Sequence, residues 1–151
     1  MISVGKRVSE SRVEQIQLIR PVHMNGARRL FGGQLMEWID VAAALSARRP
    51  CRCEVTTACV DRLQFLQPAY EDDTVVLTAH VTYTGRTSME VRVDSYVEAL
   101  DGSRRLINTA YLIMVAVDKN GTPIPVPPVL PETEEEKAEY AAGKARREAR
   151  K

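Results

Sequence analysis

One segment of this chain has the spacing of a long helix packed against a sheet. After the glycine pair Gly32-Gly33, apolar and small side chains recur at helical intervals, namely Leu35, Met36, Ile39, Ala42, Ala43 and Ser46. The run should stop at Arg48-Arg49-Pro50, which predicts a helix of about 15 residues. Its alanines would let a sheet approach closely. The rest of the core must then be built from strands.

The other apolar segments have the patterns of strands. They are residues 11–20, which Pro21 ends, residues 75–83 and 89–99, which alternate like half-buried strands, and residues 110–117, which are almost continuously apolar like a central strand. Gly85 opens one connection, and Asp101-Gly102 and Asn120-Gly121 are turn signals. Because short hairpins join only antiparallel neighbours, we expect an antiparallel sheet.

One strand, one long helix and a run of antiparallel strands make an α+β arrangement. A sheet wrapped around a single small-faced helix is the hotdog arrangement, which we expect as one domain over residues 1–131. One such subunit leaves strand edges open, so pairing with another copy is expected.

The tail has a different character. Residues 123–131 hold five prolines and should run extended over the surface. Thr133 and Glu136 form a capping box for a helix within residues 132–151. That segment is charged, has few apolar residues and is interrupted by Gly143, so we expect a peripheral or frayed helical tail.

Composition excludes several classes of protein. The 151 residues are 44% apolar and 27% charged, as in a single globular domain, and the net charge of +1 argues against a broad nucleic-acid-binding face. No apolar run approaches the roughly 20 residues that span a bilayer, and no signal peptide is evident, so we expect no membrane partner. The odd cysteine count indicates reduced thiols and a cytoplasmic protein. Cys51 and Cys53 are too close for the usual zinc pair, and no metal is expected.

Familiar catalytic motifs do not occur in the sequence, which has no Gly-x-Ser-x-Gly, no P-loop and no His-x-x-x-His. What remains is residues 23–40. Gly32-Gly33 at the start of the helix leaves backbone N–H groups uncovered, as in an oxyanion hole, or forms only a tight turn. Asp40 has no Lys or Arg three or four residues away and is either an exposed aspartate or a site carboxylate. Asn25 has the position of a residue that forms an Asx turn before a helix, and His23 is interpreted as a loop or packing residue.

Taken together, these residues resemble a known signature. Residues 25–40, with Phe31-Gly32-Gly33 followed by Asp40, resemble the hotdog acyl-CoA thioesterases of the brain-type acyl-CoA hydrolase family, which also includes bacterial acyl-CoA hydrolases. The resemblance covers most of the chain in the right order, through residues 60–65, 83–91, 108–111, 123–131 and 134–136. One departure is Arg28, where family members usually have glycine, so the path of this loop can differ.

The resemblance implies an enzyme that hydrolyses acyl-CoA to a free fatty acid and coenzyme A. Asp40 would be general base or nucleophile, Asn25 of the partner subunit would orient water or the thioester, and the N–H groups of Gly32 and Gly33 would polarise the carbonyl. A thioester is reactive enough for one base and an oxyanion hole to suffice. No cofactor is implied beyond the coenzyme A of substrate and product. The implied assembly is a homo-oligomer of hotdog dimers, a hexamer arranged as a trimer of dimers.

Arg86, Thr87 and Ser88 lie at a strand connection. A cation with two hydroxyls suits the phosphates of coenzyme A, although the same residues suit a plain hairpin. Lys119 and residues 144–151 are interpreted as solvated surface. Two alternatives remain: a non-catalytic acyl-CoA-binding or sensing module on the same fold, and a dehydratase, for which His23 is the one histidine near the motif.

Overall fold

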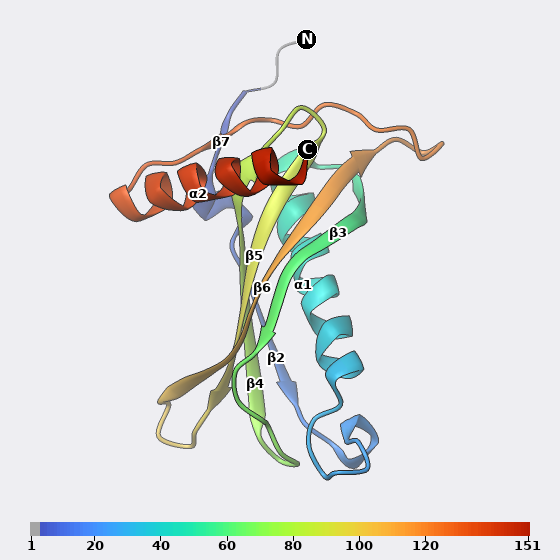
Figure 1. Cartoon of the computed structure of the whole chain (residues 1–151), viewed down its shortest axis with the longest axis vertical. Helices are drawn as coiled ribbons and strands as arrows, with labels where there is room; N and C mark the ends of the chain where they lie inside the picture. Colours follow the sequence, from blue (N-terminus) through green and yellow to red (C-terminus); the bar gives the residue numbers. More distant parts are fainter. Residues whose placement is uncertain (1–3) are drawn as a thin grey trace.

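A five-stranded sheet with a helix on each face forms the protein (Figure 1). The computed structural model describes residues 4–151. The strand order is β2-β4-β5-β6-β3, and all neighbours are antiparallel. The main elements are β2 (Val13–Leu18), α1 (Gly32–Cys51), β3 (Glu54–Phe65), β4 (Thr74–Thr84), β5 (Ser88–Glu98), β6 (Arg104–Val117) and α2 (Glu134–Arg150). The α+β hotdog arrangement expected from the sequence is confirmed.

Four short elements complete the fold. They are two 3-10 turns, η1 (Val8–Ser11) and η2 (Pro21–His23), and two strands, β1 (Lys6–Arg7) and β7 (Val129–Leu130), which pair in parallel. The pairing ties the proline-rich segment to the start of the chain. The expected turns are confirmed, with Gly102 and Gly121 at positive φ.

The concave face of the sheet packs on α1 through small side chains. Ala42, Ala43 and Ala47 have no exposed surface, and the hydroxyl of buried Ser46 donates to the carbonyl oxygen of Ser11 at 2.7 Å. Because these side chains are short, the helix backbone lies close to β4 and β5. This stripe packs against the larger buried side chains of the strands, and burial of their apolar surface contributes roughly 25 cal/mol per Å² to stability.

The expected end of α1 at Pro50 is wrong. The helix continues through Pro50 to Cys51 and ends with Arg52 in the left-handed conformation, whose N–H donates to the carbonyl oxygen of Arg48 at 2.8 Å. Proline removes one helical N–H, but so close to the C-terminus no further turn depends on it. Pro50 is also buried, which offsets the lost hydrogen bond.

The helix α2 lies at the periphery on the opposite face of the sheet, as one expectation had it, and it is continuous from Glu134 to Arg150 and not frayed. The expectation of a solvated surface over residues 144–151 is wrong for Arg146, Arg147 and Arg150, which contact strand residues. The start of α2 is the expected capping box, in which the N–H of Glu136 donates to Thr133 Oγ1 at 3.0 Å. Gly143 is the point of closest approach, because a Cβ there would lie 2.8 Å from Tyr83 Cβ and from Glu90 Oε1. Arg146 donates two hydrogen bonds to the buried carboxylate of Glu90.

This helix changes the burial of the strands beneath it. Residues 75–83 and 89–99 alternate in sequence as expected, but Glu90 and Asp94 on the polar face of β5 are buried. The strands are therefore covered on both faces where α2 crosses them. Within residues 4–151, neither helix is long and apolar enough to span a membrane.

Candidate active site

The loop before α1 is organised by the side chain of Asn25. Its Oδ1 accepts hydrogen bonds from the N–H groups of Ala27 at 2.9 Å and Arg29 at 3.1 Å, as expected of an Asx turn. Arg28 lies between them at φ 62°, the left-handed region that favours glycine. The loop thus keeps a glycine-like backbone path although an arginine occupies the position. The Asn25 amino group has no hydrogen-bond acceptor within residues 4–151.

The first turn of α1 presents free backbone N–H groups. Phe31 is the N-cap residue, and its carbonyl oxygen accepts from the N–H groups of Gln34 and Leu35. The amides of Gly32 and Gly33 have no acceptor in the described part of the chain. A Cβ on Gly33 would lie 2.5 Å from the Phe31 ring, so a larger residue there would have to displace this exposed ring. The positive end of the helix dipole points outward at this position.

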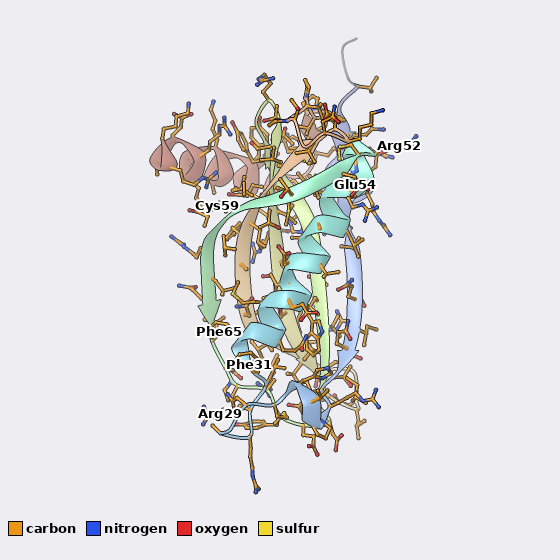
Figure 2. The ribbon with its side chains drawn as sticks, turned by 90° about the vertical axis from the view of Figure 1, so that its right-hand side faces the viewer. Arg29, Phe31, Arg52, Glu54, Cys59 and Phe65 are labelled. Carbon is orange, nitrogen blue, oxygen red and sulfur yellow. The ribbon has the colours of Figure 1, made fainter. Side chains whose placement is uncertain are left out.

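A cleft of about 350 Å³ joins Asn25 to the start of the helix. Its walls are mostly apolar and include Gly32, Leu35, Phe65, Leu66 and Ile107. Figure 2 shows Phe31 and Phe65 together at this end of α1, one at the start of the helix and one at the end of β3. The structure therefore brings Asn25 and Gly32 together beside an apolar surface suited to an acyl chain.

Asp40 lies further along the same helix and outside this cleft. Asp40 follows Gly32 by eight positions, which is about 12 Å of helix rise. Its Oδ1 accepts a hydrogen bond of 2.6 Å from Thr57 Oγ1 on β3. Thr57 Oγ1 also lies 3.5 Å from Met114 Sδ, and Asp40 has no ion-pair partner within residues 4–151. The half-buried carboxylate is oriented by a hydroxyl and keeps its negative charge unpaired.

Thr57, the hydrogen-bond donor to Asp40, is a candidate site residue that the sequence interpretation missed. It lies at the first of two register shifts in β3, where the pairing with β6 skips between Thr57 and Cys59. A β-bulge of this kind redirects a side chain, here toward α1. The one signal in the sequence is the loss of apolar alternation across residues 56–59.

His23 and the cysteines are not part of this arrangement. His23 packs edge-on against Trp38 with ring centroids 4.9 Å apart, and its Nδ1 accepts from the N–H of Arg20. Burial and the neighbouring Cys51 thiol raise the pKa of Cys53 to about 12, so that thiol stays protonated and is a poor nucleophile. No group of His, Cys, Asp and Glu within residues 4–151 could hold a metal ion.

The turn with Arg86, Thr87 and Ser88 is held on several sides. The carbonyl oxygens of Arg86 and Thr87 accept from the N–H groups of Val126 and Ala116. Ser88 Oγ accepts from Arg147 of α2 at 3.0 Å. The exposed Arg86 side chain makes no hydrogen bond or ion pair within residues 4–151. The turn is therefore held by these hydrogen bonds and carries a cation, Arg86, without a partner in the described residues.

Comparisons with known proteins give relatives of one kind. Residues 28–100 match the family model described as the thioesterase superfamily. The chain is 47% identical over 128 residues to the uncharacterized acyl-CoA thioester hydrolase YkhA of Bacillus subtilis, covering 84% of this chain and 74% of that protein. It is also 33% identical over 143 residues to acyl-coenzyme A thioesterase 11 of Mus musculus. That match covers 93% of this chain but only 24% of the mouse protein.

Solved structures agree. An apo-hexameric acyl-CoA thioesterase superposes with a TM-score of 0.93 at 42% identity, covering 97% of this chain and 95% of the other. An acyl-CoA hydrolase from Staphylococcus aureus in complex with butyryl coenzyme A, coenzyme A and coenzyme A disulfide superposes with a TM-score of 0.90 at 36% identity, covering 96% and 89%. Structures of the same Staphylococcus aureus hydrolase also exist with an asparagine, an aspartate and a threonine each replaced by alanine.

Proposed function

The chain belongs to the acyl-CoA thioester hydrolases of the thioesterase superfamily, and we propose that it cleaves acyl-CoA with Asp40 as catalytic carboxylate and the amides of Gly32 and Gly33 as oxyanion donors. The observation that carries this proposal is the unpaired, hydroxyl-oriented carboxylate of Asp40. Asn25, Asp40 and Thr57 also have the same spacing in the chain as the three residues replaced in the Staphylococcus aureus hydrolase.

The chemistry needs few groups because a thiolate leaves readily. In the general-base route Asp40 takes a proton from water, and the oxygen of that water attacks the thioester carbonyl carbon. Negative charge then develops on the carbonyl oxygen and is stabilised by the free N–H groups at the start of a helix. The C–S bond breaks, the acyl group leaves as the acid, and the sulfur of coenzyme A takes up the proton. In the nucleophilic route Asp40 attacks directly and water resolves the acyl-enzyme anhydride.

We propose that each active site combines two subunits. One subunit holds two separate parts, the cleft with Asn25 and Gly32 and the Asp40–Thr57 pair, and no described contact joins Asn25 to Asp40. A partner that faces α1 would bring its cleft to Asp40. Exposed apolar side chains support assembly at this face, with Val41 on α1 and Val60 and Phe65 on β3. The hexameric relative supports an assembly of three such dimers.

For binding, we propose that coenzyme A contacts Arg86, Thr87 and Ser88 and that no other cofactor takes part. The unpaired Arg86 supports this role, as does the coenzyme A bound to the Staphylococcus aureus relative. The cytoplasmic location inferred from the cysteines stays a prediction.

The test is release of free coenzyme A from a panel of acyl-CoA thioesters, followed with a thiol reagent. We expect turnover by the wild-type protein and a fall in kcat of at least about 100-fold in Asp40→Asn, because the base or nucleophile is lost. Coenzyme A binding should be nearly unchanged in that variant. Binding without turnover by the wild-type protein would favour a non-catalytic acyl-CoA sensor instead, and near-native kcat in Asp40→Asn would remove Asp40 from the mechanism.

A further inference from the structure

A second cleft lies where α2 ends on the sheet. It has a volume of about 260 Å³ and is lined by Cys59, Ser88, Ile113, Arg147, Arg150 and Lys151. In Figure 2 Cys59 marks the bend of β3 in the half of the molecule that carries α2. This cleft borders the turn with Arg86, yet its helical residues come from the segment that the sequence interpretation assigned to solvated surface.

Most cations at the end of α2 have carboxylate partners. Arg146 binds Glu90 at 2.8 Å, Arg150 binds Asp61 at 3.1 Å, and Lys151 binds Glu148 at 3.3 Å. Arg147 differs, because the contact it makes within residues 4–151 is its donation to Ser88 Oγ and not to an acid. Its positive charge is therefore free to attract an anion.

The guanidinium of Arg147 lies close against the turn at Gly85. A Cβ on Gly85 would lie 2.7 Å from Arg147 Nη1, so any other residue at position 85 would push the guanidinium away. Since Ser88 Oγ accepts from Arg147, the Ser88 hydroxyl proton remains available to donate. Arg86 on the same turn makes no side-chain hydrogen bond or ion pair within residues 4–151. Arg147 and Ser88 line the cleft and supply one cation and one hydroxyl donor, while Arg86 lies two residues before Ser88 on the same turn.

The helix dipole does not create this site. The C-terminal end of a helix carries about half a negative elementary charge, which favours Arg147 but disfavours an anion near the backbone. A ligand would have to be held by the side chains. Guanidinium groups suit this role because their planar N–H donors match phosphate oxygens.

We propose that Arg147 of α2 binds a phosphate group of the coenzyme A portion of the substrate, together with Ser88 and Arg86. The inference rests on the proposed function and extends the coenzyme A site from the turn to the C-terminal helix. A phosphate is remote from the thioester and is bound alike in the ground and transition states, so Arg147 should affect KM and leave kcat unchanged.

The experiment compares Arg147→Gln with wild type on three butyryl thioesters: butyryl-CoA, butyryl-dephospho-CoA and butyryl-pantetheine. We expect a rise in KM of about tenfold for butyryl-CoA with kcat within about twofold, the loss typical of one charge-assisted hydrogen bond. Butyryl-pantetheine should show no difference. If the 3′-phosphate is the group bound, the difference should also vanish with butyryl-dephospho-CoA, and if it persists there the diphosphate is bound. Arg147→Lys should restore part of the affinity.

Lys144→Gln is the matched control, because Lys144 is an exposed cation on the same helix and makes no ion pair within residues 4–151. Equal rises in KM for butyryl-CoA and butyryl-pantetheine in Arg147→Gln would show that Arg147 only supports the turn. An unchanged KM for butyryl-CoA would likewise overturn the proposal.

Calorimetry with adenosine 3′,5′-bisphosphate and with coenzyme A separates this inference from the catalytic one. If the wild-type protein hydrolyses no thioester, the proposed function fails. The phosphate site is judged separately: it is overturned if each of the two compounds binds to Arg147→Gln with the same affinity as to the wild-type protein.

Discussion

The hydroxyl of Thr57 gives the Asp40 carboxylate its orientation. The hydrogen bond of 2.6 Å to Oδ1 comes from a different element and leaves Oδ2 for water or substrate. Because Thr57 lies at a β-bulge, its direction is set by the backbone of β3 and not by a flexible loop. A short bond to a charged acceptor is stronger than one between neutral groups.

Replacing Thr57 by valine removes the hydroxyl and keeps the side-chain shape. We expect kcat to fall about tenfold or more, because a hydrogen bond to a charged group contributes about 1.5–3 kcal/mol. Steady-state kinetics on one acyl-CoA would measure this. Thr57→Ser keeps the donor and should retain most of the activity. Equal kcat in Thr57→Val and wild type would show that Asp40 needs no orienting donor.

Sequence reasoning reached Asp40 but not Thr57, for a physical reason. Asp40 stands out because a helix has a regular spacing, against which an acid without a nearby cation is visible. In β3 two register shifts interrupt the alternation, so no pattern tells which side chains face α1. For Arg28, in contrast, the sequence raised a doubt that the structure removes. The doubt concerned the path of its loop, yet the Asn25 side chain holds the backbone in the glycine-like path.

The docking of α2 depends on charged side chains on the outer face of the sheet. Glu139 accepts a hydrogen bond of 2.7 Å from His80 Nε2 and binds Arg92 at 3.4 Å, and Arg12 pairs with Glu136 of the same helix. Burial acts to raise the pKa of Glu139, but the hydrogen bond with His80 and the charges of His80, Arg92 and Arg12 outweigh it and leave this pKa lowered.

A lowered carboxyl pKa ties stability to pH. The ionised Glu139 stabilises the folded state above the ordinary glutamate value of 4.5, and this contribution is lost as the pH falls through the lower folded-state value. We expect Glu139→Gln to reduce the free energy of unfolding by about 1 kcal/mol at pH 7, after allowance for solvent screening. The difference from wild type should shrink toward zero near pH 3. Urea denaturation at both pH values measures it.

Glu135→Gln is the control for that experiment, since Glu135 is exposed on the same helix and has no ion-pair partner within residues 4–151. It should change stability little at either pH. If the free energy of unfolding of Glu139→Gln is lower than that of wild type by the same amount from pH 7 to pH 3, packing and not ionisation accounts for the contribution of Glu139 to stability.

The existence of α2 was predictable, but its contacts were not. The capping box of Thr133 and Glu136 marks its start without knowledge of any neighbour. Its contact face uses Glu139, Gly143 and Arg146, residue types that are usually solvated or disruptive in a helix. The partner acid Glu90 likewise appeared as the solvent side of an alternating strand. Pairing across elements cannot be inferred from either segment alone.

Assembly can be tested by mixing two inactive variants. Asn25→Asp keeps the oxygen that holds the loop and removes the amino group, while Asp40→Asn removes the carboxylate. If each site combines Asn25 and Asp40 of different subunits, a mixed dimer has one intact site and one doubly damaged site. Refolding the two variants together should restore roughly a quarter of wild-type activity, since half the dimers are mixed and half their sites are intact.

Each variant refolded alone should remain nearly inactive, and a mixture of the folded variants without denaturation shows whether subunits exchange. No recovery after co-refolding, with light scattering confirming that oligomers formed, would place both residues of a site in one subunit. A stable, active monomer in light scattering would contradict the composite site directly.

The edge strand β3 exposes Val60 and Phe65 in a single subunit, and if each site combines two subunits, this edge would link catalysis to protein concentration. On the composite scheme, turnover per subunit follows the fraction of paired chains, which mass action lowers on dilution. A substitution on this edge could then reduce the activity measured at nanomolar enzyme and leave it intact at micromolar enzyme, without touching any reacting group. The same strand that positions Thr57 would thus make the enzyme's specific activity a measure of its own abundance.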